Sequence, residues 1–108
     1  MTDTQDTPGP VSRESAAVPT AQARRYLGQL CKHFAHKLPV TFDEIAGTIP
    51  FASGTCHLVA TDAALTIDLE APADGMEELR DVVTRHLDRF AFREELVYDW
   101  HPIRAPDA

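Results

Sequence analysis

The sequence predicts an α+β domain, a two-layer sandwich in which two helices cover one face of a largely antiparallel sheet. Two segments, centred near Leu27 and Val83, have apolar residues at helical spacing. Between them, short segments alternate apolar and polar residues with the period of two that strands show. The predicted order is α-β-β-β-β-α-β, with four or five strands in the sheet.

The beginning of the chain differs in composition from the rest of its 108 residues. Residues 1–18 are rich in Thr, Asp, Pro, Gly and Ser and show no apolar periodicity, so we expect a disordered N-terminal tail. Residues 19–103 are expected to form a single globular domain. Residues 104–108 are expected to form a flexible C-terminus.

The first helix is predicted from Thr20, as its N-cap, to about Lys37. Pro39 prevents its continuation. The apolar face of this helix is Ala23, Leu27, Leu30 and Phe34. Two short strands follow, over residues 38–42 and 48–52. Pro50 in the second argues for an edge position or a bulge.

The clearest hairpin joins residues 56–60 to residues 65–69 through a turn at Asp62-Ala63. Its register places His57 opposite Asp68 on the outer face. The second helix then begins with a capping-box-like pair, Asp74 and Glu77, and runs to about Ala91. After it, alternating residues predict a last short strand or a packed extended segment before Pro102; they are Leu96, Tyr98 and Trp100.

Charge and composition exclude several classes of function. The net charge is −7, whereas nucleic-acid binding needs a basic surface. The N-terminus has no secretory signal, and no apolar run approaches the roughly 18 residues of a membrane helix. We therefore predict a cytoplasmic protein, without nucleic-acid or membrane partners, in which Cys31 and Cys56 are reduced core residues.

Five histidines and two cysteines raise the question of a metal site. Zinc or iron needs three or four converging ligands, and no pair in the sequence has the spacing of a metal motif. On the first helix, Cys31 lies about 160° around the axis from His33, which excludes a chelate between them. The sequence therefore predicts no metal site and no cofactor.

Four segments form a set that resembles a known bacterial family. They are Ala23–Leu27, Leu30–Phe34 with Lys37, Gly54–Leu58, and Val82–Glu94 followed by Trp100. Together they resemble the bacterial domain of unknown function numbered 2218, over about Thr20 to Pro102. The resemblance implies a small stand-alone protein without an established activity. It also implies a connection with iron or siderophore metabolism, because some members resemble modules joined to flavin-dependent siderophore-interacting proteins. The matched polar and aromatic positions, none with a known role, are His33, Lys37, His86, Arg89 and Trp100.

His86 is the leading candidate for a functional residue. It falls in the middle of the apolar stripe of the second helix, where an imidazole needs a hydrogen-bond partner. The structural interpretation bonds it to a backbone carbonyl or to an acidic or sheet residue nearby. The functional interpretation places it with His33, Arg89 and Lys37 around a groove between the helices, which would suit an anion. Arg89 has the alternative of a salt bridge to the acidic residues after the helix.

The other candidates have simpler interpretations. His33 and His36 are three residues apart on one flank of a helix, which is typical of a surface pair. His57 opposite Asp68 resembles an oriented general base, but equally an ordinary cross-strand polar pair, and the second interpretation is favoured.

Trp100 belongs to an aromatic group near the end of the chain, with Tyr98, Phe90 and Phe92. Closure of the core is the favoured use of these rings; a flat apolar ligand or a dimer contact is the alternative. If the second helix continues past Ala91, Phe92 falls on its polar side. Either the helix stops at Ala91 or Phe92 marks an interface.

The sequence thus favours a small non-enzymatic binding or accessory domain, with its iron or siderophore context taken from the resemblance. The expected partner is a small anionic ligand or a flavin-dependent siderophore-interacting protein. One alternative is a small enzyme in which His86 is the general acid/base and Arg89 clamps an anion. Another is a structural homodimerisation module that uses the outer sheet face or Phe92 and Trp100.

Overall fold

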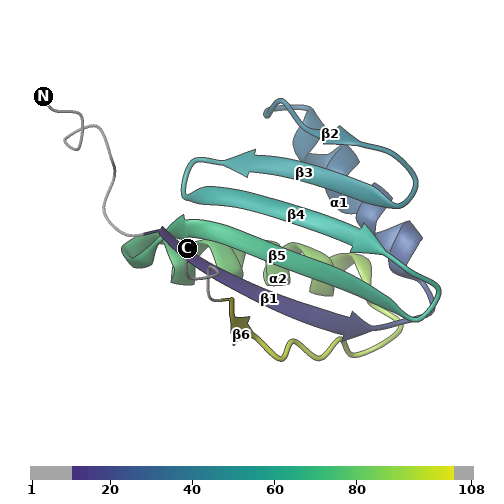
Figure 1. Ribbon diagram of the computed structural model, residues 1–108. Coiled ribbons are helices and arrows are strands. Elements are labelled where there is room, and N and C mark those ends of the chain that lie inside the picture. The colour runs from purple at the N-terminus through teal and green to yellow at the C-terminus, as the bar shows by residue number, and fades with distance from the viewer. Residues whose placement is uncertain (1–10, 104–108) are drawn as a thin grey trace, which may run out of the picture.

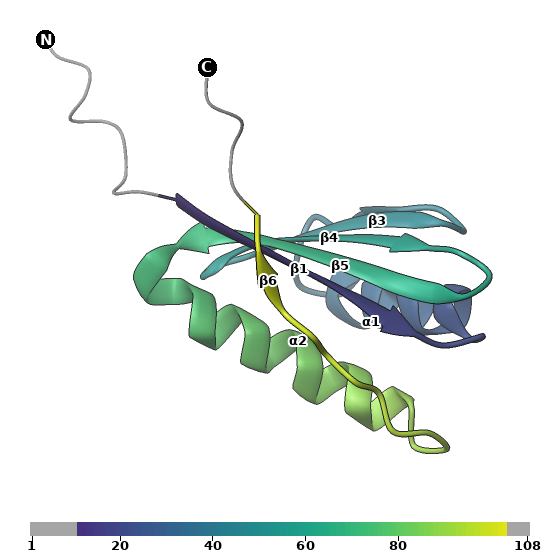
Figure 2. The same ribbon diagram turned by 60° about the horizontal axis from the view of Figure 1, so that its bottom comes forward.

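The computed structural model describes residues 11–103 and confirms the predicted α+β class. A six-stranded antiparallel sheet carries both helices on one face (Figures 1 and 2). The strand order in the sheet is β2-β3-β4-β5-β1-β6. The elements are β1 Val11–Pro19, α1 Ala23–Ala35, β2 Thr41–Phe42, β3 Ala46–Phe51, β4 Gly54–Ala60, β5 Ala64–Pro72, the 3₁₀ turn η2 Ala73–Gly75, α2 Met76–Phe90 and β6 His101–Pro102.

The N-terminal strand β1 is the main correction to the sequence prediction. Residues 11–18 were expected in a disordered tail, but they pair with β5 along the whole of β1, from Val11 opposite Pro72 to Pro19 opposite Ala64. The order therefore begins with an additional strand, and the sheet has one strand more than the upper prediction. Strand propensity is low in this Ser- and Ala-rich segment, so the pairing depends on its neighbours in the sheet. Residues 1–10 and 104–108, the rest of the two predicted tails, lie outside the described residues.

Helix α1 is shorter than predicted at both ends. Its N-cap is Gln22, which makes no side-chain capping bond. Thr20 instead forms a turn ahead of the helix, because its hydroxyl accepts a hydrogen bond from the Gln22 N–H (3.0 Å) and donates one to Glu94 (2.9 Å). The prediction that Thr20 is the N-cap is therefore wrong.

The β4–β5 hairpin has the predicted register, with His57 opposite Asp68. Strand β2 is shorter than predicted and pairs only with Gly47 and Thr48 of β3. Pro50 lies beyond the reach of β2, so its lack of an N–H leaves no gap in the pairing with that edge strand.

Helix α2 ends close to the predicted position but starts differently. Its N-cap is Gly75, which makes no side-chain capping bond, so the Asp74–Glu77 capping box does not form. After the helix, residues 95–100 are extended without pairing, and only His101 and Pro102 form a strand, opposite Ser15 and Glu14 of β1. Of the two predicted alternatives, the structure shows mainly the packed extended segment.

The core lies between the sheet and the two helices. Its largest fully buried side chains are Leu27, Leu30, Ile49, Leu58, Leu65, Ile67, Leu69, Leu79 and Leu87. Cys31 and Cys56 are buried free thiols in this core, as predicted. Burial raises the pKa of Cys31 to about 11 and also raises that of Cys56. Neither helix within residues 11–103 is long and apolar enough to cross a membrane.

Candidate functional site

The structure brings His33 of α1 and His86 of α2 together where the two helices touch. Their ring centroids are 5.0 Å apart, with the rings tilted by 50°. Phe34 lies 4.8 Å from His86, and Phe90 lies 5.9 Å from His33. Two histidines from different helices therefore share one small aromatic group, and each lies within reach of the other's charge.

His86 is half-buried, and one of its two nitrogens has a partner. Its Nδ1 lies 2.7 Å from the carbonyl oxygen of Val82, one turn earlier in the same helix. Because a carbonyl oxygen only accepts, Nδ1 must carry the proton in this contact. This is the backbone bond of the structural interpretation. It also leaves Nε2 of the neutral ring as a hydrogen-bond acceptor and a base.

Positive charge surrounds the two histidines. Arg85, His86 and Arg89 line a pocket of about 330 Å³. Arg85 is paired with Asp81 in the same helix (3.1 Å). Within residues 11–103, no acidic group forms a salt bridge with Arg89, so the alternative pairing with the acidic residues after the helix is not made.

The pKa of His33 is affected by this positive charge. Desolvation of the ring, followed by the positive charges of His86, His36, Lys37 and Arg89, lowers the pKa of His33 from its ordinary value. Lys37 lies just past the end of α1, where its N–H is bonded to the Phe34 carbonyl oxygen (3.0 Å). We refer to His33, Lys37, His86 and Arg89 as the cationic cluster.

Trp100 has its ring contact elsewhere. It stacks on Tyr98, with centroids 6.3 Å apart and an interplanar angle of 6°, in the extended segment that follows α2. Both rings are partly buried against the core, and the Tyr98 hydroxyl donates to Asp88 (3.0 Å). The described contacts therefore place Trp100 with the core, the use of these aromatic residues that the sequence favoured.

His57 and Asp68 face each other in the sheet but are not hydrogen-bonded to each other. Nδ1 of His57 lies 3.2 Å from the Thr48 hydroxyl, and Asp68 accepts a hydrogen bond from the Ser15 hydroxyl. These residues form a polar row across four strands, which is the ordinary cross-strand arrangement. In the part of the chain that the structure describes, no three His, Cys, Asp or Glu side chains lie close enough to hold a metal ion.

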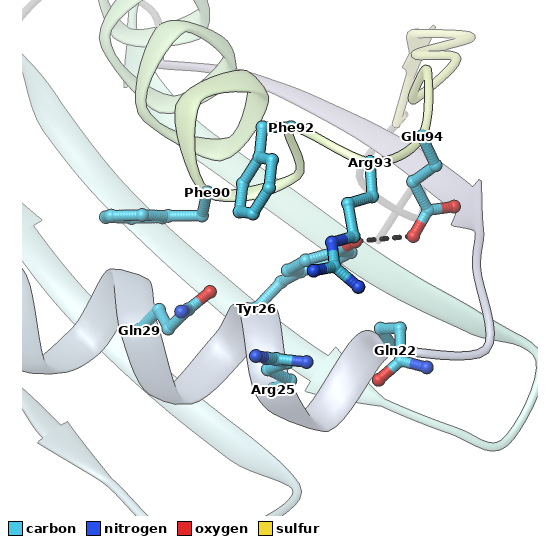
Figure 3. Close-up of a pocket in the computed structure, with 8 residues that line it drawn as sticks. All are labelled: Gln22, Arg25, Tyr26, Gln29, Phe90, Phe92, Arg93 and Glu94. Atoms are coloured by element: carbon cyan, nitrogen blue, oxygen red, sulfur yellow. Dashed lines mark hydrogen bonds between the residues drawn. The ribbon is translucent and has the colours of Figure 1, made fainter.

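A second pocket between α1 and the loop after α2 was missed by the sequence analysis (Figure 3). It has a volume of about 380 Å³ and is lined by Gln22, Arg25, Tyr26, Gln29, Phe90, Phe92, Arg93 and Glu94. Its residues come from two segments far apart in the sequence, so no local sequence motif indicates it. The one available signal was Phe92, an aromatic residue on the polar side of the predicted helix.

The fold and these side chains define a small two-layer α+β domain whose helices contribute residues to several surface pockets. The chain belongs to the DUF2218 family, described as an uncharacterized protein conserved in bacteria, which matches residues 15–101. The match begins within β1, in agreement with the place of that strand in the sheet.

A solved structure of a similar protein supports the same fold. The chain resembles the NMR structure of PA4090 from Pseudomonas aeruginosa, with 34% sequence identity and a TM-score of 0.71. The match covers 83% of this chain and 95% of that chain. No curated protein matches the chain.

Proposed function

We propose that this chain is a small binding domain that takes an anionic ligand at the cationic cluster. The observation that carries the proposal is the His33–His86 pair, with rings 5.0 Å apart, beside an Arg89 that has no salt-bridge partner among residues 11–103. Like charges held this close raise the free energy of the protonated state, and a bound anion would offset that cost.

The chemistry of the groups suits a carboxylate or a phosphate. Arg89 offers a planar fork of donors, and Lys37 offers a point charge. The pKa of His33 is lowered from its ordinary value by desolvation and by the neighbouring positive charges. A bound anion would raise that pKa, so we expect His33 to take up a proton when the anion binds. The whole chain carries −7, so the cluster is a local exception that can steer an anion to one place on the molecule.

The iron and siderophore context gives the first ligands to test. Ferric siderophores, flavin, haem and small dicarboxylates all present anionic groups. A flavin-dependent siderophore-interacting protein is the corresponding protein partner.

Calorimetry with each of these ligands tests the proposal. We expect at least one to bind, and Arg89→Gln to weaken that ligand about tenfold, the effect of losing one charge-assisted hydrogen bond. Lys32→Gln is the matched control, because Lys32 is an exposed cation of α1 outside the cluster. Absence of binding by all four ligand classes would remove the proposal, as would a ligand that Arg89→Gln binds as tightly as the unchanged protein does.

A second candidate function, catalysis by His86, has one observation in its favour. The Val82 carbonyl fixes the proton on Nδ1, so Nε2 is oriented as a base, the arrangement that a general acid/base requires. Turnover of small carboxylic or phosphoric esters that is lost in His86→Ala, with the fold retained, would support it. If His86→Ala only lowers stability and no ester is turned over, this candidate fails.

A further inference from the structure

We infer that the pocket between α1 and the loop after α2 is a second binding site, and that its ligand is a planar aromatic anion. We call it the Phe92 pocket (Figure 3). It shares no residue with the cationic cluster, although Phe90 lines it and also contacts His33. The inference therefore stands apart from the proposed function and can fail or succeed without it.

Hydrogen bonds between the loop after α2 and the residues around the start of α1 hold the pocket together. Helix α2 ends at Phe90, and the next residues turn back, with the Glu94 N–H bonded to the Ala91 carbonyl oxygen (3.2 Å). Glu94 then accepts two hydrogen bonds at the same carboxylate oxygen, from Tyr26 (2.5 Å) and from Thr20 (2.9 Å). Tyr26 is only 5% exposed, so its hydrogen bond ties the loop to a residue of the core.

Two phenyl rings give the pocket an apolar wall. Phe90 is half-buried, whereas Phe92 has 79% of its surface exposed, the highest value among the large hydrophobic side chains of residues 11–103. Removal of a phenylalanine side chain from water is stabilising. A flat ring inserted beside Phe92 would recover part of that free energy and stack on a second ring at the same time.

Two guanidinium groups give the pocket its charge. Arg25 extends from α1 and Arg93 from the loop, and in Figure 3 the Arg93 side chain points toward the helix that carries Arg25. Neither arginine forms a salt bridge among residues 11–103. The guanidinium carbon of Arg93 lies 5.5 Å from the Phe92 ring centroid, so charge and aromatic surface are in contact.

The balance of charge selects an anion. The lining carries two arginines against one carboxylate, and an oxygen of that carboxylate is already occupied by Tyr26 and Thr20. A ligand carboxylate can pair with the guanidinium groups, while its ring lies against the phenyl wall. The volume of about 380 Å³ lies within the range of small-molecule pockets and is large enough for a bicyclic acid.

Nuclear magnetic resonance titration of the full chain with 2-naphthoate tests this site. We expect shifts of the backbone amides of residues 22–29 and 90–94. Two reference compounds separate the ring from the charge: cyclohexanecarboxylate keeps the charge without a flat ring, and 2-naphthylmethanol keeps the ring without the charge. Each should bind about tenfold more weakly than 2-naphthoate.

Variants on exposed side chains avoid loss of the fold. Arg25→Gln and Phe92→Ala should each weaken 2-naphthoate about five- to tenfold. The matched controls are Arg24→Gln and Phe42→Ala, which change the same residue types outside the pocket and should leave the affinity within about twofold. Arg89→Gln should also leave it within about twofold, which separates this site from the cationic cluster.

Three results would overturn the inference. The first is an affinity for 2-naphthoate that neither Arg25→Gln nor Phe92→Ala changes. The second is a set of shifted amides that surrounds His33 and His86 instead of Phe92. The third is a dimer, detected by light scattering and dissociated by Phe92→Ala, because a second copy would then cover the ring.

Discussion

His33 and His86 show how two ordinary helix residues acquire unusual surroundings through packing alone. Each lies on its own helix, and the residues next to it in the sequence do not show that the other histidine lies beside it. Contact between α1 and α2 places the rings 5.0 Å apart. Desolvation of the His33 ring, followed by the positive charges of His86, His36, Lys37 and Arg89, lowers the pKa of His33. This perturbation predicts a dependence of stability on pH.

We expect the free energy of unfolding to fall as the pH drops below about 6.5. The pKa of His33 is lowered in the folded protein, so the unfolded chain binds the proton first as the pH falls, and acid favours unfolding. Above the unfolded pKa the effect is absent. Urea unfolding at pH 7.5 and pH 5.5 measures it, and His33→Gln should reduce the difference. His57→Gln, on the outer sheet face, should not; an equal reduction in both variants would contradict this origin.

Replacement by alanine is expected to have opposite effects on stability at two glycines, Gly47 and Gly28. A Cβ at Gly47 would lie 2.6 Å from the Cys31 sulfur and 3.1 Å from Cβ of Phe42, so Gly47→Ala should destabilise by about 1–3 kcal/mol. A Cβ at Gly28 would meet nothing within 4 Å, and this glycine lies inside α1. Gly28→Ala should therefore stabilise by about 0.5–1 kcal/mol. Thermal unfolding of both variants measures the two changes in stability. Changes of equal sign would contradict the contrast between a crowded Gly47 and an open Gly28.

Among the elements, β1 is the strand that joins the edge strand β6 to the rest of the sheet. It lies between β5 and β6, and Glu14 on it accepts two hydrogen bonds from Arg80 of α2 (2.6 and 2.8 Å). One strand thus joins an edge of the sheet to its centre and also reaches the helical layer. Its contribution can be tested with two neighbouring alanines.

Ala16→Asp and Ala17→Asp are a matched pair within β1. Ala16 is 1% exposed and faces the core, whereas Ala17 is exposed on the other face. A carboxylate buried at position 16 without a partner should unfold the protein or cost several kcal/mol. At position 17 it should change stability by less than about 0.5 kcal/mol. Circular dichroism and urea unfolding distinguish them; equal tolerance of both substitutions would mean that β1 is not part of the folded sheet.

The elements also show what the sequence could and could not predict. The β4–β5 register was predictable, because the turn at Asp62-Ala63 sets which residues lie opposite each other and the alternation sets which of them face the core. Strand β1 was not, because its alternation consists of Ala16 and Val18 among serines and charges. Its strand conformation is imposed by the partner, and partner effects do not appear in a local pattern.

Over the whole molecule, the two sites also differ in whether a local sequence pattern could predict them. The cationic cluster could be suspected, since His86 interrupts an apolar stripe and Arg89 follows it. The Phe92 pocket could not, because Arg25 and Arg93 line one pocket only when the loop that follows α2 is bonded to Tyr26 through Glu94. A site assembled by long-range hydrogen bonds has no signature in sequence spacing.

The position of β1 has a consequence for how the protein is made. During translation β1 emerges first, yet both of its neighbours in the sheet, β5 and β6, emerge later, and β6 is nearly the last described segment. The segment must remain unpaired on the nascent chain until most of the domain has been synthesised. A strand rich in valine and isoleucine would be prone to aggregate over that interval. The serines, charges and alanines that give β1 its weak strand signal therefore also suit it to the delay before its partners exist.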